Sequence, residues 1–200
     1  MVAQPEAIDG RAARAERTRD AVVDAVLELI GEGKIRPGAP AIAQRAGVSL
    51  RTVFHHYADL EALFSAAAER HFARVLGTAP RIDRTLPLEA RIDAFASARG
   101  ALLETITPVR RAAVLLEPFS PEIARRLAWM RARGRRETER VFAAEIGRRR
   151  GAARGTLREA LTAATSWPAW EMLRAHQGLS PGGARNVMAH MLRALLKEDD

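Results

Sequence analysis

The sequence contains no cysteine, so neither a disulfide nor a thiolate metal site can form. Its first residues, Met-Val-Ala-Gln-Pro-Glu, lack the charged and then apolar pattern of a secretory signal. No run of about 18 apolar residues occurs, which excludes a helix that spans a membrane. These three absences predict a protein of the reducing cytoplasm with no membrane partner.

Aromatic residues are also scarce, at 5% of the 200 residues, whereas alanine, leucine, arginine and glutamate are abundant. The abundant types are strong helix formers, so the composition favours helices. A chain of this length can bury a sound core as one large or two small domains. We therefore expect an all-α protein.

The formal net charge of +8 favours an anionic partner. The excess is unevenly distributed, because residues 1–57 hold eight lysines and arginines against seven acidic residues. The surplus arginines come later, between residues 125 and 154. Total charge therefore does not locate a nucleic-acid surface, and a local motif has to do so.

One short segment predicts two helices joined by a tight turn. Pro40 suits the first turn of a helix over 40–46, because its missing N–H would have no partner there. Gly47 can adopt the positive φ of a sharp helix exit, and Ser49 is a good N-cap for a second helix over 50–57. This arrangement predicts a helix-turn-helix motif, whose second helix enters the major groove of DNA. Its small core is expected to contain Ile42, Ala43, Val48, Val53 and Phe54.

The segment reads Ile-Ala-Gln-Arg-Ala-Gly-Val-Ser-Leu-Arg-Thr-Val-Phe-His-His-Tyr and is followed by Ala-Asp-Leu-Glu-Ala-Leu. It resembles the TetR family of bacterial transcriptional regulators, strongly over residues 17–75 and more loosely afterwards. The resemblance implies a homodimer with an N-terminal DNA-binding domain and an all-α C-terminal domain that binds a small effector. We expect a mobile arm over 1–12, a three-helix helix-turn-helix domain over 13–77 and a helical effector-binding and dimerisation domain over 78–200, with about nine helices in all.

Residues that contact DNA are expected on two helices. The first helix should run from Ala13 to Gly31 and bring polar and basic residues near its N-terminus, where phosphates are attracted; a solvated face is the alternative. In the second helix of the motif, Arg51 is expected to read guanine O6 and N7, with a phosphate contact as the alternative, and Thr52 can meet a thymine methyl group or a phosphate. The predicted set is Arg17, Thr18, Arg19, Ser49, Leu50, Arg51, Thr52, His55, His56 and Tyr57.

Three positions depart from what the resemblance implies. The family usually has a hydroxyl near Gly38, a tyrosine at Phe54 and a lysine at Leu60, each of which contacts phosphate. Phe54 is therefore assigned to packing, and affinity should depend on Arg51 and the arginines of the first helix. The same departures favour an alternative, a helical small-molecule-binding or scaffolding protein that no longer regulates DNA.

Prolines and capping residues divide the rest of the chain into further helices. We expect helices over 87–105, 109–116, 121–148, 156–176 and 181–196, with a basic turn over 148–154. Pro168 should kink the fourth of these helices. The last two carry broad apolar stripes, which resemble the four-helix dimer interface of the family. We therefore expect a homodimer formed through them.

The effector site should be a mostly apolar pocket with a few polar groups. Ordinary core packing is the alternative for every candidate residue. The effector itself is expected to be apolar or amphipathic. The candidate lining residues are Phe95, Leu102, Leu103, Trp129, Met130, Phe142, Trp167 and Trp170.

The sequence shows no arrangement of residues typical of an enzyme. It has no nucleophile with its base, no glycine-rich phosphate loop and no HExxH motif. His55 and His56 point about 100° apart on a helix and lack acidic neighbours, so no metal or cofactor is expected. We predict a DNA-binding transcriptional regulator, a homodimeric repressor that an effector releases from a pseudo-palindromic operator, with activation as the alternative direction.

Overall fold

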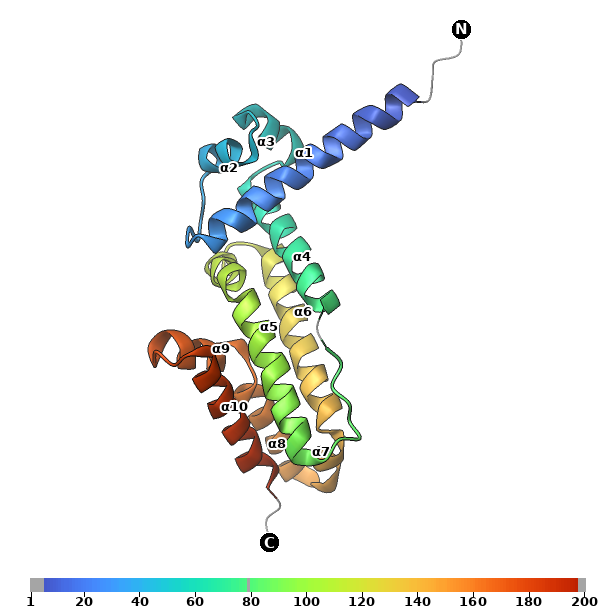
Figure 1. Cartoon of the computed structure of the whole chain (residues 1–200), viewed down its shortest axis with the longest axis vertical. Helices are drawn as coiled ribbons and strands as arrows, with labels where there is room; N and C mark the ends of the chain where they lie inside the picture. Colours follow the sequence, from blue (N-terminus) through green and yellow to red (C-terminus); the bar gives the residue numbers. More distant parts are fainter. Residues whose placement is uncertain (1–5, 79, 198–200) are drawn as a thin grey trace. The chain divides into compact units, whose positions relative to one another are not determined.

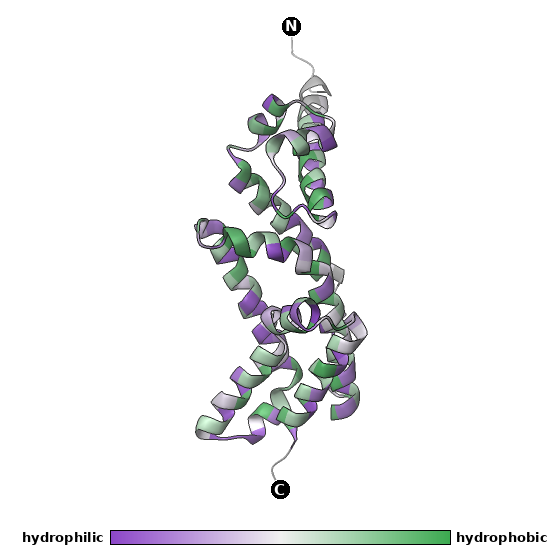
Figure 2. Cartoon of the chain, turned by 90° about the vertical axis from the view of Figure 1, so that its left-hand side faces the viewer, coloured by the Kyte–Doolittle hydropathy of each residue, from purple (hydrophilic) through white to green (hydrophobic). Residues whose placement is uncertain are grey.

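The computed structural model describes residues 6–78 and 80–197, and every regular element in that part of the chain is helical (Figure 1). It contains ten α-helices and one π-helix over these residues, which confirms the all-α prediction. No helix among them is both long enough and apolar enough to cross a membrane. Figure 2 shows apolar and polar residues alternating around the helices, as expected where one face of a helix is buried.

Contacts within the chain group it into two compact units. The first unit is Met1–Arg74 with Pro108–Ala124, and the second is Val75–Thr107 with Arg125–Asp200. This division differs from the single boundary near Gly77 that we predicted, because a segment from the middle of the chain joins the first unit. The functions assigned to the two predicted domains stay predictions.

The first unit contains the helices that form the helix-turn-helix motif. They are α1 (Glu6–Gly31), α2 (Ala39–Ala46), α3 (Leu50–His56) and most of α4 (Leu60–Thr78). α1 contacts both α2 and α3. The core contains the fully buried side chains of Val22, Val26, Leu29, Ile42 and Leu63. At the surface, Arg45 of α2 forms ion pairs with Glu28 of α1 at 3.3 Å and with Glu32, which directly follows α1, at 2.7 Å.

The start of α1 differs from the prediction. We expected an arm over 1–12 and a helix from Ala13, but the helix already begins at Glu6, and residues 1–5 lie outside the described residues. The stretch is rich in alanine and charged residues and has no apolar stripe. Its helicity therefore follows from intrinsic propensity, which a search for apolar periodicity misses.

The second unit holds the remaining helices, and α5 and α6 contribute residues to both units. Their bounds are α5 (Leu88–Leu116), α6 (Pro121–Val141), α7 (Ala143–Arg148), α8 (Gly151–Ala164), α9 (Trp167–Glu171), the π-helix η1 (Met172–His176) and α10 (Pro181–Leu196). The last of these was predicted correctly, with Ser180 as its N-cap, which accepts a hydrogen bond from the Gly183 amide at 3.1 Å.

Several predicted breaks fall elsewhere. Pro108 lies inside the continuous helix α5, where the Thr107 hydroxyl donates to the Leu103 carbonyl at 2.6 Å. The helix predicted over 121–148 is interrupted at Phe142, between α6 and α7. A single proline costs a helix one amide donor, so sufficient packing can carry the helix through it.

Two more corrections concern the helices near the C-terminus. α7 ends at Arg148 and α8 begins at Gly151, so only residues 149 and 150 of the predicted basic turn over 148–154 lie outside a helix. Pro168 occupies the first turn of α9, after the N-cap Ser166, and does not kink a longer helix. The position of Pro168 follows from a local rule, since proline is well tolerated in the first turn of a helix.

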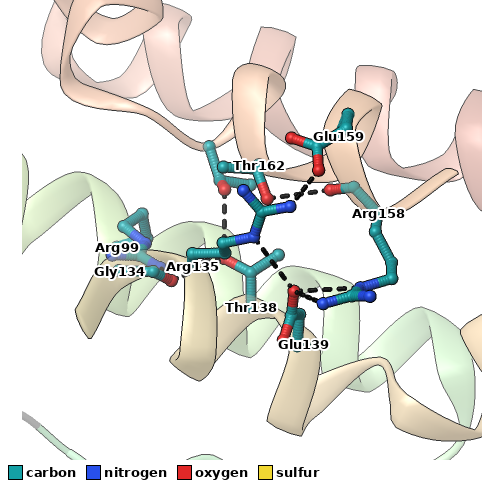
Figure 3. A network of polar contacts seen from close by, with 9 residues as sticks. Arg99, Gly134, Arg135, Thr138, Glu139, Arg158, Glu159 and Thr162 are labelled. Atoms are coloured by element: carbon teal, nitrogen blue, oxygen red, sulfur yellow. Dashed lines mark hydrogen bonds and ion pairs between the residues drawn. The ribbon is translucent and has the colours of Figure 1, made fainter. Parts of the chain in front are cut away.

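Ion pairs connect α6 to α8. Figure 3 shows Arg135 between Glu139 and Glu159, and Arg158 of α8 reaching back to Glu139. The Arg158–Glu139 contact measures 2.7 Å. The charges form a network across the two helices, which is more effective than isolated surface pairs.

Candidate nucleic-acid interface

The turn of the motif has the backbone that its glycine predicts. Gly47 ends α2 with φ 66° and ψ 31°, the left-handed conformation, and the Val48 amide donates to the Ala43 carbonyl at 3.0 Å. Glycine adopts this conformation without steric cost. At the other end of α2, Gly38 is the N-cap but makes no side-chain hydrogen bond. The expectation of a left-handed Gly47 at the end of α2 is confirmed.

The start of α3, the second helix of the motif, is set by two hydroxyls. The Ser49 Oγ accepts a hydrogen bond from the Thr52 amide at 3.0 Å, which confirms Ser49 as the N-cap. The hydroxyls of Ser49 and Thr52 also lie 2.8 Å apart, within hydrogen-bond distance. The cap therefore satisfies an otherwise unpaired amide and holds both hydroxyls at the same helix end.

α3 has one buried face and one exposed face. Val53 is 1% exposed and belongs to the core, whereas Leu50, Arg51 and His55 are exposed. Thr52 and His56 are partly exposed. Arg51 makes no ion pair with any described residue, so its guanidinium is available to a ligand. The exposed face therefore carries polar, basic and apolar groups together.

Phe54 is the main correction in this motif. We assigned it to packing, but its side chain is 45% exposed. It follows Val53 directly, so the two side chains point about 100° apart around the helix. Only one of the two can face the core, and the smaller β-branched residue does.

Tyr57 is buried rather than presented to a ligand. Its side chain is 5% exposed, and its hydroxyl donates to the Arg19 carbonyl of α1 at 3.3 Å. The Arg19 guanidinium lies 5.4 Å from the centre of the Tyr57 ring, a cation–π distance. A buried ring cannot lie against a duplex, so we leave Tyr57 out of the set that we propose for direct contact with DNA.

The polar residues of α1 lie away from its N-terminus. Arg17 and Arg19 are exposed, and the Thr18 hydroxyl donates to the Arg14 carbonyl at 3.0 Å. Because the helix begins at Glu6, these residues are more than two turns inside it. The partial positive charge at the N-terminus of a helix acts only within its first turn. It therefore does not attract a phosphate to Arg17, Thr18 or Arg19, contrary to our expectation. Any phosphate contact here would depend on the arginine side chains alone.

The residues predicted to line an effector pocket fall into two groups. Phe95, Leu103, Met130, Phe142 and Trp170 are buried, whereas Leu102 and Trp167 are partly exposed and Trp129 is 50% exposed. The rings of Phe95 and Phe142 meet edge to face at 5.2 Å between centroids. The indole nitrogens of Trp167 and Trp170 donate to Thr107 and Glu104 at 3.1 and 3.0 Å.

The second unit also has a pocket of about 840 Å³, open to solvent, and none of the predicted effector residues lines it. Its walls are residues 81–85 with Arg91, Arg140, Val141, Ala143 and Ala144. Arg140 is paired with Glu137 at 2.7 Å, and its hydrogen bond is the main cause that lowers the pKa of Glu137.

Two buried arginines of the second unit, Arg91 and Arg99, were not predicted from the sequence. Arg91 pairs with Glu145, and both side chains are only 7% exposed. Arg99 donates to the Gly134 carbonyl at 2.8 Å and to Thr138 at 3.0 Å, and burial lowers the pKa of Arg99 to about 10. Arginine is usually exposed, so only the tertiary structure reveals these positions.

No protein-family model matches the sequence, and no curated protein matches it. Solved structures do match. A transcriptional regulator from Rhodococcus sp. Rha1 is 18% identical over 91% of this chain and 95% of its own, with a TM-score of 0.67. A TetR-like transcriptional regulator from Rhodococcus sp. RHA1 is 19% identical over 94% and 98%, with a TM-score of 0.60.

A third match is the multidrug binding protein EbrR, solved in complex with imidazole. It is 23% identical over 88% of this chain and 89% of its own, with a TM-score of 0.56. These likenesses extend over nearly the whole chain, beyond the helix-turn-helix segment. The chain therefore has the fold of TetR-like transcriptional regulators, as the sequence predicted.

Proposed function

We propose that this chain is a DNA-binding transcriptional regulator that binds a pseudo-palindromic operator as a homodimer. The observation that carries the proposal is the exposed face of α3, where Arg51 projects without an ion pair from a helix whose start is fixed by the Ser49 cap. Arginine at such a position can donate two hydrogen bonds to guanine O6 and N7. The surrounding contacts are proposed to be Arg17, Thr18, Arg19, Leu50, Thr52, His55 and His56.

The dimer is proposed to form through α8 and α10. Val187, Met191 and Leu195 lie four residues apart on α10 and are partly exposed, which leaves an apolar stripe for a second copy. In a dimer, two recognition helices enter successive major grooves only if they lie roughly 34–36 Å apart. Sedimentation analysis of the purified protein tests this part, because a strictly monomeric state would overturn it.

Release by a small effector in the second unit is the regulatory part of the proposal. The candidate ligand environment is the buried Phe95–Phe142 ring pair together with Trp170, and the effector is proposed to be apolar or amphipathic. Such a ligand acts only through its different affinity for the two arrangements of the recognition helices. Shifting the protein from nearly all bound to nearly all released takes about 5.5 kcal/mol of preference. Bound in the operator, the dimer would block the promoter, so repression is the proposed direction.

Selection of genomic DNA fragments by the purified protein tests the function as a whole. We expect an enriched palindrome, with affinity that falls steeply as salt rises because counterions are released from phosphates. Uniform weak binding without an enriched sequence would instead support a helical ligand-binding or scaffolding protein. The absence of a side-chain cap at Gly38 is the observation that favours this second candidate.

A further inference from the structure

Two large apolar side chains are exposed on the recognition helix. Leu50 is 43% exposed and Phe54 is 45% exposed. They are four residues apart on α3, so they lie on the same face as neighbours. The core of the first unit uses Val53 and Tyr57 of this segment and leaves the Leu50–Phe54 pair in solvent.

The exposed face of α3 consists of two parallel rows. One row is the apolar pair Leu50 and Phe54, and the other is Arg51 and His55, which are also four residues apart and exposed. Successive residues turn about 100° around a helix, so the rows lie side by side. A surface that enters the major groove thus presents hydrogen-bond donors beside an apolar strip.

The major groove offers one apolar group, the C5-methyl group of thymine. Leu50 and Phe54 carry no hydrogen-bonding atom in their side chains, so they can contribute neither a phosphate contact nor a polar base contact. Contact with thymine methyl groups buries them, whereas cytosine at the same place offers no methyl group.

We propose that Leu50 and Phe54 read thymine methyl groups in each half-site of the operator, next to the base pair that Arg51 contacts. The inference rests on the proposed DNA-binding function and adds the chemical feature that the protein selects. It makes Phe54 a specificity-determining residue in place of the packing residue that the sequence suggested.

The experiment uses the operator obtained by DNA selection. Synthetic duplexes carry deoxyuridine in place of one thymine at a time, which removes a single methyl group and leaves base pairing intact. Affinity of the full-length protein is measured by fluorescence anisotropy at one fixed salt concentration. At one or two positions per half-site, we expect uracil to weaken binding about fourfold for each methyl group buried.

Three variants locate the effect. Leu50→Ala and Phe54→Ala should bind the thymine and uracil duplexes equally at the position each residue contacts. Arg51→Ala should bind more weakly but keep the full preference for thymine over uracil, because it acts on a different base pair. Thermal unfolding followed by circular dichroism checks that each variant is folded, which is expected because all three side chains are exposed.

The outcomes separate this inference from the function on which it rests. If selection yields no operator, the proposed function fails. If an operator is bound but uracil has no effect at any position, or if its half-sites contain no thymine, the methyl-reading inference is overturned while the DNA-binding function stands. A preference for thymine that survives in both alanine variants would also overturn it.

Discussion

The ring of Trp170 lies so close to Gly100 that a Cβ atom at position 100 would be 3.0 Å from Cη2 and 3.2 Å from Cζ3 of the indole. Gly100 therefore serves close packing within the helix α5. The indole also donates to Glu104 at 3.0 Å, and Arg174 contacts the same carboxylate at 2.8 Å. The glycine thus lets α5 and α9 approach while the polar contacts hold the ring in place.

Gly100→Ala should destabilise the protein, although alanine is the better helix former. Overpacking of this kind costs about 1–3 kcal/mol, which exceeds the gain of up to about 1 kcal/mol from helix propensity. The measurement is the free energy of unfolding from urea denaturation. Gly147→Ala is the matched control, since a Cβ there would meet nothing within 4 Å, and it should be neutral or stabilising. Equal effects of the two substitutions would contradict the packing argument.

The buried pair of Arg91 and Glu145 should be sensitive to the loss of one partner. Glu145→Ala leaves a buried guanidinium without its carboxylate, and we expect a loss of about 3–5 kcal/mol in the free energy of unfolding. Glu159→Ala is the control, because that carboxylate is 63% exposed where it pairs with Arg135. Its loss should cost less than about 1 kcal/mol. A Glu145 variant as stable as the control would show that the pair is not desolvated.

Arg51→Ala should lower affinity for the selected operator by about 1–3 kcal/mol and relax the preference at one base pair in each half-site. Affinity and selectivity are both read from binding to the operator and to its single-base variants. Arg125→Ala serves as the control, since it removes the same charge from an exposed position in the second unit. If the Arg51 variant keeps the full sequence selectivity, Arg51 does not read a base and contacts only phosphate.

Acid should weaken the link between α1 and α2. The hydrogen bond from Arg45 is the main cause that lowers the pKa of Glu32 below its ordinary value of 4.5. The stabilisation by this carboxylate is therefore present above about pH 4.5 and is lost as the pH falls through its lowered pKa in the folded protein. We expect Glu32→Gln to reduce the melting temperature at pH 7 but much less at pH 3.

Glu16→Gln provides the comparison for that experiment. Glu16 is an exposed glutamate of α1, the helix that ends directly before Glu32, and it makes no ion pair within the part of the chain that the structure describes. The melting temperature of the Glu16→Gln variant should equal that of the unmodified protein at both pH values. If the two variants behave alike, the Arg45 contact makes no measurable contribution to stability.

The turn of the motif could be predicted because its determinants are local. The left-handed Gly47 and the Ser49 cap act within a few residues, and Asp59 accepts a hydrogen bond from the Ala62 amide at 2.8 Å, as expected of an N-cap of α4. Such contacts are read directly from spacing. The continuous helix through Pro108 could not be read in this way, since its continuation depends on packing that outweighs one lost hydrogen bond.

The sequence by itself determined that the chain is helical, that a helix-turn-helix lies near residue 47 and that Arg51 is on its second helix. Only the tertiary structure decided which aromatic side chain of that segment is buried: the Tyr57 ring is 5% exposed and its hydroxyl donates to a carbonyl of α1 38 residues away, whereas Phe54 is 45% exposed. The same holds for Arg91 and Glu145, which are 54 residues apart. Burial depends on contacts between distant parts of the chain, and no local pattern contains them.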